Sequence, residues 1–171
     1  MMMHYGTDFP AFIAAFAPLA KIGYLADAAR LDLTLRASYH AADAVPLDPK
    51  VFETLGPDAV MGARLSLAPA TRLLRSDWPL FDIWRYSFTE DAPKPRSAAQ
   101  DVIITRPAFD PAPDLLPPGA ALWLSHLADG LPFGAAHDAT AGAQPAFDLA
   151  AALTLALSHG VFSAISLEGS K

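Results

Sequence analysis

The chain has 171 residues, of which 53% are hydrophobic and 16 are proline, and it has a formal net charge of −6 and no cysteine. A chain this long and apolar can bury a core, so a disordered protein is excluded. The lack of cysteine excludes disulfides, thiolate metal sites and cysteine nucleophiles. The N-terminus has no basic stretch before an apolar one, and no run of about 18 apolar residues occurs, so we expect a cytoplasmic protein with no signal peptide and no membrane span.

The first third of the chain has the apolar spacing of helices. A helix over 9–16 follows good N-terminal capping residues and precedes Pro18, which ends it. A second helix is predicted over 19–40, and its apolar residues cover so wide an arc that we expect it to pack on more than one side. A short helix over 49–55 follows.

The stretch from Gly62 to Tyr86 is the one around which the rest of the chain is organised. Leu65 and Leu67 alternate with polar residues, and a period of two continues from Thr71 onward. This alternation is typical of strands with one buried face. We therefore predict a core hairpin here, against which the flanking helices pack.

The second half begins with a polar, proline-rich loop over 89–100. The elements predicted after it are a strand over 101–106, a proline-rich turn or extended connection over 107–118, helices over 120–128, 131–139 and 149–159, and a final strand over 161–167. Asp148 is the expected N-cap of the third of these helices. The predicted fold class is α+β, with N-terminal helices, a small antiparallel sheet and a C-terminal winged-helix-like trio of helices.

The predicted elements divide the chain into two parts. Residues 1–61 form an N-terminal helical segment, and residues 62–171 form the small sheet with the winged-helix-like module. The two parts are also compatible with one compact unit.

No pattern in the chain indicates catalysis. The histidines have no metal-ligand spacing, and no nucleophile elbow, phosphate loop or dinucleotide-binding motif occurs. His40 near Asp43 is either a site pair or a helix-end histidine bonded to backbone or to Asp43, and Asp27 with Arg30 reads as a surface pair. We expect no enzyme activity, no cofactor and no metal.

Charge is distributed unevenly along the chain. Seven of the 12 Lys and Arg residues lie between Arg64 and Arg106, and none lies from 107 to 170. The arginines are either the solvated faces of strands or a surface for an acidic partner, since guanidinium groups bind carboxylates with two hydrogen bonds. A winged helix would favour DNA binding, but a half without basic residues would repel a phosphate backbone, so DNA binding is the alternative hypothesis and not the leading one.

Five blocks of the first half occur in the order found in one known family. They are Tyr5-Gly-Thr-Asp-Phe-Pro-Ala-Phe12, Gly23-Tyr-Leu-Ala-Asp-Ala-Ala-Arg-Leu31, Tyr39-His-Ala-Ala-Asp-Ala-Val-Pro-Leu47, Arg72-Leu-Leu-Arg-Ser-Asp-Trp-Pro79 and Ile83-Trp84. In these blocks the chain resembles the HvfC/BufC family, whose members are often labelled as DNA-binding domains. The family has His-Pro-Ser where this chain has Ala68-Pro69-Ala70, and we expect the family's N-terminal helical domain to be missing here.

The resemblance implies an accessory protein for the maturation of ribosomal peptide natural products (RiPPs). Its partners would be the leader of a precursor peptide and a TIM-barrel multinuclear non-haem iron enzyme of the BufB/HvfB type. The order of strands and helices in the second half also resembles the PqqD-like recognition element, in which the leader adds a strand beside the third strand and contacts the third helix.

These resemblances define two sets of candidate residues. The candidates for peptide binding are Val102, Ile103, Ile104, Thr105 and Arg106 on the strand, with Leu149 and Leu153 on the third helix. The candidates for contact with the iron enzyme are Arg72, Arg75, Trp78, Trp84 and Arg85. We expect main-chain pairing along the strand to give affinity and side-chain pockets near the third helix to give specificity.

Overall fold

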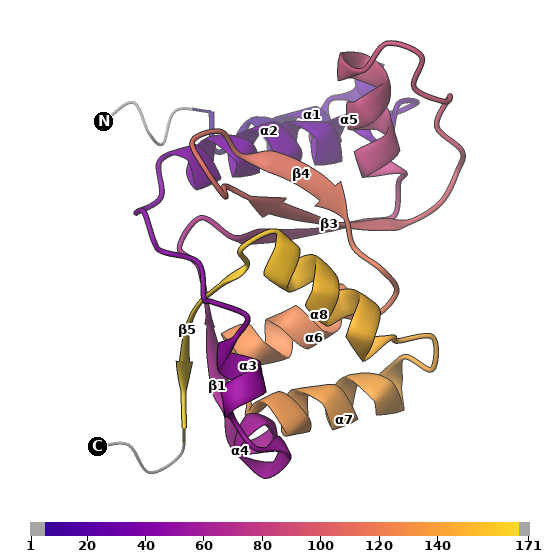
Figure 1. Ribbon diagram of the computed structural model, residues 1–171. Helices are drawn as coiled ribbons and strands as arrows, with labels where there is room; N and C mark the ends of the chain where they lie inside the picture. The colour runs from indigo at the N-terminus through magenta and orange to yellow at the C-terminus, as the bar shows by residue number, and fades with distance from the viewer. Residues whose placement is uncertain (1–5, 168–171) are drawn as a thin grey trace.

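The computed structural model describes residues 6–167 of the chain (Figure 1). Its helices are α1 (Phe9–Ala15), the short 3-10 helix η2 (Ala17–Leu19), α2 (Leu25–Tyr39), α3 (Val51–Thr54), α4 (Pro57–Gly62), α5 (Leu80–Phe88), α6 (Ala120–Ala128), α7 (Phe133–Ala143) and α8 (Leu149–Ser158). Its strands are β1 (Arg64–Leu67), β2 (Arg72–Ser76), β3 (Gln100–Thr105), β4 (Ala112–Leu115) and β5 (Phe162–Ser166). The α+β fold class is therefore confirmed.

A three-stranded antiparallel sheet with the order β2-β3-β4 lies at the centre of the fold. In this sheet Ile103 pairs with Leu73 of β2 on one side and with Asp114 of β4 on the other. Helices α2 and α5 lie on one face of the sheet, and α6 and α8 lie on the other (Figure 1). The sheet is thus the middle layer of three.

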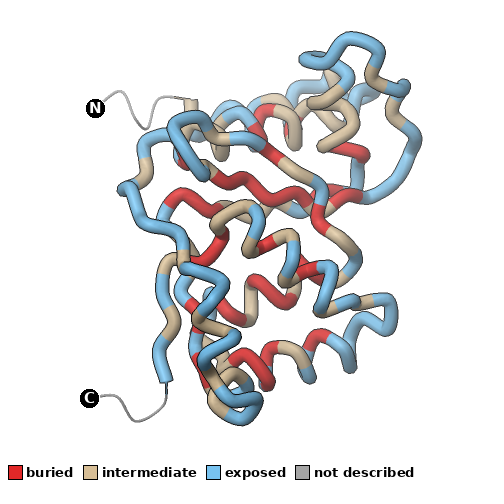
Figure 2. Tube along the Cα trace, in the orientation of Figure 1, coloured by how far each residue is buried: buried red, intermediate tan, exposed pale blue. Residues whose placement is uncertain are grey.

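The alternation of side chains along β3 explains this layering. Val102 and Ile104 pack with Leu31 of α2 and Leu80 of α5, whereas Ile103 belongs to the cluster around Trp123 of α6. Because successive side chains of a strand point to opposite faces, a strand that is apolar throughout must be covered on both sides. Accordingly, most residues of β3 are buried, and so are several residues of α6, which covers one face of the sheet (Figure 2).

A second, two-stranded sheet pairs β1 with β5 in antiparallel register. The predicted hairpin is therefore wrong, because β1 and β2 belong to different sheets and the chain turns from one to the other at Ala68–Thr71. A hydrogen bond from the Ala68 N–H to the Val161 carbonyl, 2.7 Å long, ties this turn to the second sheet. The rest of the predicted hairpin, after β2, is helix α5.

The C-terminal helices follow the predicted order. Helix α6 spans the predicted 120–128, and Asp148 caps α8 by accepting a 3.0 Å hydrogen bond from the Ala151 N–H. Gly119 has φ +80°, and a Cβ there would meet the Phe147 ring at 2.9–3.2 Å, so this position before α6 requires glycine. Helix α2 is shorter than predicted, since the chain before Leu25 forms η2 and turns.

Candidate functional site

The predicted peptide-binding strand is the central strand of the sheet. Val102, Ile103 and Ile104 are 0% exposed and Thr105 is 3% exposed. Both edges of β3 are paired, one with β2 and one with β4. An added peptide strand would have to displace β4 or β2, so the prediction of strand addition at residues 101–106 is wrong.

The free edges of the sheet belong to its outer strands, and the register identifies their exposed main-chain groups. The Leu116 N–H donates to the Asp101 carbonyl over 2.9 Å, which places Asp101 and Ile103 among the residues that bond to β4. Bonded and non-bonded pairs alternate in an antiparallel ladder. The main-chain groups of Pro113 and Leu115 therefore point away from the sheet.

This edge of β4 has few main-chain groups to offer. Pro113 has no N–H, and the Leu115 N–H donates to its neighbour, the Asp114 carboxylate, over 2.7 Å. Proline at a non-bonded position of an edge strand is the usual way in which proteins blunt an open edge. A strand added here would be held by the Leu115 N–H and by the carbonyls of Pro113 and Leu115.

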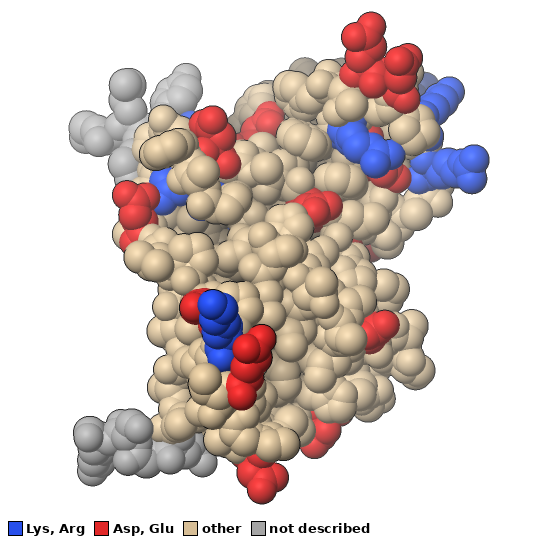
Figure 3. Space-filling model, viewed as in Figure 1, with Lys and Arg blue, Asp and Glu red and all other residues tan. Residues whose placement is uncertain are grey.

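Helix α8 lies beside β4 on the same side of the molecule (Figure 1). The Asp114 carboxylate and the His159 Nε2 at the end of α8 are 2.9 Å apart. Leu149 and Leu153, the two candidates on this helix, are half-buried against the core. Figure 3 shows few charged side chains over α8, so the surface beside β4 is mainly apolar and uncharged.

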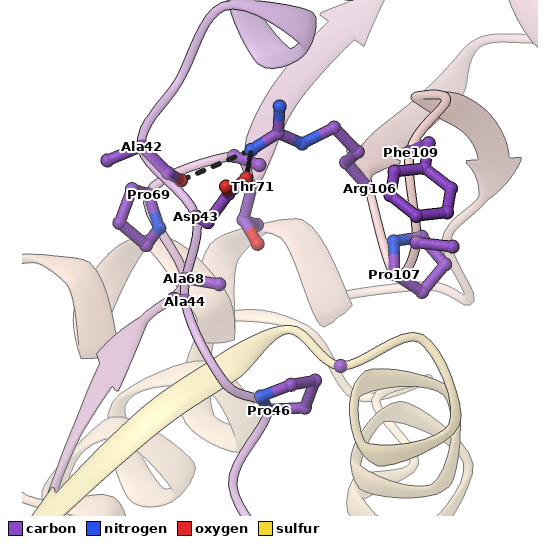
Figure 4. A pocket seen from close by; sticks show the side chains of 13 residues that line it. Ala42, Asp43, Ala44, Pro46, Ala68, Pro69, Thr71, Arg106, Pro107 and Phe109 are labelled. Atoms are coloured by element: carbon purple, nitrogen blue, oxygen red, sulfur yellow. Dashed lines mark hydrogen bonds and ion pairs between the residues drawn. The ribbon is translucent and has the colours of Figure 1, made fainter.

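A pocket of about 160 Å³ lies between the chain after α2, the turn before β2, the loop that follows β3 and the residue Gly160 after α8. Figure 4 shows the rings of Pro46, Pro69, Pro107 and Phe109 around it, and Gly160 also lines it. Phe109 is 85% exposed at the tip of the loop between β3 and β4. The walls of the pocket therefore combine these rings with the polar side chains of Asp43, Thr71 and Arg106.

Arg106 forms the upper wall of this pocket, but its guanidinium group is committed to α2. Its nitrogens donate to the carbonyls of Tyr39, Ala41 and Ala42 over 2.6, 2.9 and 3.3 Å, and Nη2 lies 2.8 Å from the Asp43 carboxylate. The side chain is 10% exposed. Carbonyls at the end of a helix have no partner within the helix. Arg106 satisfies them, so its role is to hold the end of α2 and not to meet a peptide.

The five candidates for contact with the iron enzyme lie on β2, on α5 and on the short segment between them. Arg72 and Arg75 lie on β2, where Arg72 donates to the carbonyls of Pro69 and Thr71 and the Arg75 Nε lies 3.2 Å from the Asp101 carboxylate. Trp78 follows β2 and is 39% exposed.

The remaining two candidates lie on α5. Trp84 stacks on Phe81 and contacts Phe88, and the Arg85 guanidinium lies 5.8 Å from the Phe81 ring centre. Trp78 lines a pocket together with Ile83 and Tyr86 of α5, so it lies next to that helix.

The histidines and carboxylates of the described residues do not gather into a metal site. Within residues 6–167, no group of three or more His, Asp or Glu side chains is placed to hold a metal ion. His40 stacks edge-on against Tyr39, and His137 lies 2.9 Å from its neighbour Asp138. His4 lies outside the described residues. Burial raises the pKa of Asp32 on α2.

Sequence reasoning missed β4, the strand with the free edge. Pro111 and Pro113 alternate: Pro113 occupies a position of β4 that points away from β3, where an edge strand tolerates proline, and Pro111 lies directly before the strand. That alternation was the available signal. The pocket is lined by four separate segments of the chain, and no local pattern could have indicated it.

Comparison of the chain with protein-family models, with curated proteins and with solved structures finds no match. In the part of the chain that the structure describes, no helix has both the length and the apolar character needed to cross a membrane.

Proposed function

We propose that this protein is a non-enzymatic accessory protein of RiPP maturation, which binds the leader of a precursor peptide and presents it to a multinuclear non-haem iron enzyme. The resemblance to the HvfC/BufC family suggests this role. The observation that supports it best is the outer strand β4 with its free edge beside the last of three helices. Apart from α5, which lies between β2 and β3, the order of β2, β3, β4 and the three helices α6, α7 and α8 is similar to that of the PqqD-like element. In this proposal β4 and α8 take the places of its third strand and third helix.

In this proposal the leader lies along β4 as an added strand. A leader carbonyl accepts from the Leu115 N–H, which leaves the Asp114 carboxylate, and leader N–H groups donate to the carbonyls of Leu115 and Pro113. Because Pro113 removes one donor, the main chain supplies fewer bonds than an unblocked edge strand. Specificity would come from side chains that contact Leu153 of α8.

A DNA-binding role receives no support from the C-terminal helices. The sequences of α6, α7 and α8 contain no Lys or Arg. Binding to duplex DNA depends on basic side chains that neutralise phosphates.

The test uses a pair of variants at Leu115 and a synthetic leader of the candidate precursor. Leu115→Pro removes the only N–H that β4 directs outward, and Leu115→Ala removes the same side chain but keeps that N–H. We expect the proline variant to bind the leader at least about fivefold more weakly than the alanine variant, the value for one main-chain hydrogen bond. Equal affinities in two folded variants would contradict pairing at β4.

The role as an adaptor requires a second measurement. The chain is purified together with the candidate iron enzyme, and leader binding is measured with each protein alone and with the complex. We expect a stable complex whose affinity for the leader depends on this chain. If the iron enzyme alone binds the leader as tightly as the complex does, the proposal is contradicted.

A further inference from the structure

The other outer strand of the sheet, β2, has a free edge of a different kind. Since Asp101 and Ile103 bond to β4, the residues of β3 that bond to β2 are Gln100, Val102 and Ile104. The main-chain groups of Leu73 and Arg75 therefore point away from β3. No other group among residues 6–167 forms a hydrogen bond to these main-chain atoms.

This edge is not blunted in the way that β4 is. The five residues of β2, Arg-Leu-Leu-Arg-Ser, include no proline. Leu73 and Arg75 each present an N–H and a carbonyl, so the edge offers two donors and two acceptors. A row of unpaired N–H and carbonyl groups on an edge strand is a template for another extended chain.

Two hollows beside this edge leave room for such a chain. One, of about 560 Å³, lies between the C-terminal half of α2 and Arg72 at the start of β2. The other, of about 530 Å³, lies between the N-terminal half of α2 and the residues Arg75 and Ser76 at the end of β2. Ala37 lines the first hollow and Ala26 the second, and these small side chains allow a backbone to approach α2.

The charges along the two hollows differ. The first is lined by His40 and by Arg72, whose Nη1 donates to the carbonyls of Pro69 and Thr71, and among the described residues around it there is no Asp or Glu. The second contains Arg30 and Arg75, each of which is paired with an aspartate. A ligand with a carboxylate at the Arg72 end would therefore meet a positive surface, and guanidinium groups bind carboxylates with good geometry.

We propose that the β2 edge binds an extended acidic segment of another protein by strand addition, with the acidic side chains at the Arg72 end. This site does not depend on the leader-binding role of β4. A second copy of this chain fits the edge poorly. Antiparallel pairing of β2 with β2 would bring the Arg72 and Arg75 side chains of both copies into one short ladder, where like charges repel.

The experiment selects ligands for the whole chain from random dodecapeptides displayed on phage and then measures the selected peptides as free synthetic ligands. Arg75→Pro removes one outward N–H of β2, and Arg75→Ala removes the same side chain but keeps the N–H. Leu74, the residue before it, is already in a strand, which is the conformation that a following proline favours.

We expect the selected peptides to be rich in Asp and Glu near one end. Their affinity for the Arg75→Pro variant should be at least about fivefold lower than for Arg75→Ala, as for the loss of one main-chain hydrogen bond. Leu115→Pro should leave their affinity unchanged, which separates this site from the β4 edge.

A second measurement does not depend on how the proline variant folds. Selected peptides are methylated on alternate backbone nitrogens. Since only one set of N–H groups of an added strand faces β2, one methylated series should lose binding and the other should keep it. The proposal is overturned if both series bind equally, if no acidic peptides are selected, if binding depends on Leu115, or if the free chain forms a dimer that Arg75→Pro dissociates.

Discussion

The two outer strands of one sheet differ in what they offer to a ligand. On β4 the outward positions are Pro113 and Leu115, and the helix beside them is apolar and without basic residues. On β2 the outward positions are Leu73 and Arg75, and the hollow at one end is lined by basic side chains. A proline at an outward position removes one main-chain donor from an edge strand, so β4 can make fewer bonds to an added strand than β2 can. The helix beside the edge then sets which side chains it accepts.

The largest effect on stability is expected at Ile103 of β3, because β3 holds both outer strands of the sheet. This side chain is 0% exposed and lies in the cluster around Trp123. Ile103→Ala should lower the free energy of unfolding by about 2–5 kcal/mol, since it removes buried methylene groups and leaves a cavity. Denaturant unfolding measures this loss. A loss below about 1 kcal/mol would mean that the central strand is not packed as described.

A smaller effect is expected at Arg106, which acts on the α2 side alone. Arg106→Ala removes hydrogen bonds to the last carbonyls of α2 and should cost about 1–3 kcal/mol. Arg106→Lys, the matched control, keeps the charge but lacks the planar fork, so it should recover only part of the loss. Amide exchange should become faster in the last turn of α2 and remain unchanged in α8. Equal changes in both helices would contradict this local role.

Asp114 allows the β4 edge to be changed alone. Asp114→Ala removes the partner of His159 and the acceptor of the Leu115 N–H, at a cost of at most about 1 kcal/mol for an exposed ion pair. Because the Leu115 N–H is then free, we expect tighter binding of the leader and no change for peptides that bind β2. The two affinities are measured by titration, with Asp114→Asn as the control that keeps an acceptor. Weaker leader binding in the alanine variant alone would count against competition for this N–H.

The smallest effect concerns Asp32 of α2. Burial raises its pKa, so the fold favours the protonated carboxyl, and stability falls as the pH rises through the pKa of unfolded aspartate and then that of Asp32. Asp32→Asn should therefore raise the free energy of unfolding at pH 7 and leave it nearly unchanged at pH 3. Asp32 is only partly buried and solvent screens its charge, so the gain in free energy of unfolding should stay within about 0.5 kcal/mol. A loss of stability at pH 7 would contradict this cause of the shift.

Local patterns predicted the elements that local rules govern. The apolar residues of β3 and the Asp148 cap of α8 each gave an element within a residue or two of its observed bounds. The predicted pairing failed because alternation in β1 and β2 is the same whether the two strands pair with each other or with distant partners. The choice depends on β5 and β3, which lie far away in the sequence.

The candidate site was only partly accessible from the sequence. Its helix was predicted with the residues Leu149 and Leu153, but its strand was assigned to β3 because the prolines of 107–118 read as a connection. Proline does weaken a strand, yet it is allowed on an edge where no N–H is needed. The consecutive apolar residues of β3 made it the easiest strand to recognise in the sequence. The same residues require burial on both faces, which is why β3 lies at the centre of the sheet and has no free edge.

The most direct test of leader binding at β4 is amide hydrogen exchange at Leu115 and Arg75, measured by NMR with and without the synthetic leader peptide. The account predicts that the leader slows exchange at the Leu115 amide and leaves the Arg75 amide unchanged. Slower exchange at Arg75 alone, or binding of the leader with no change at Leu115, would contradict it.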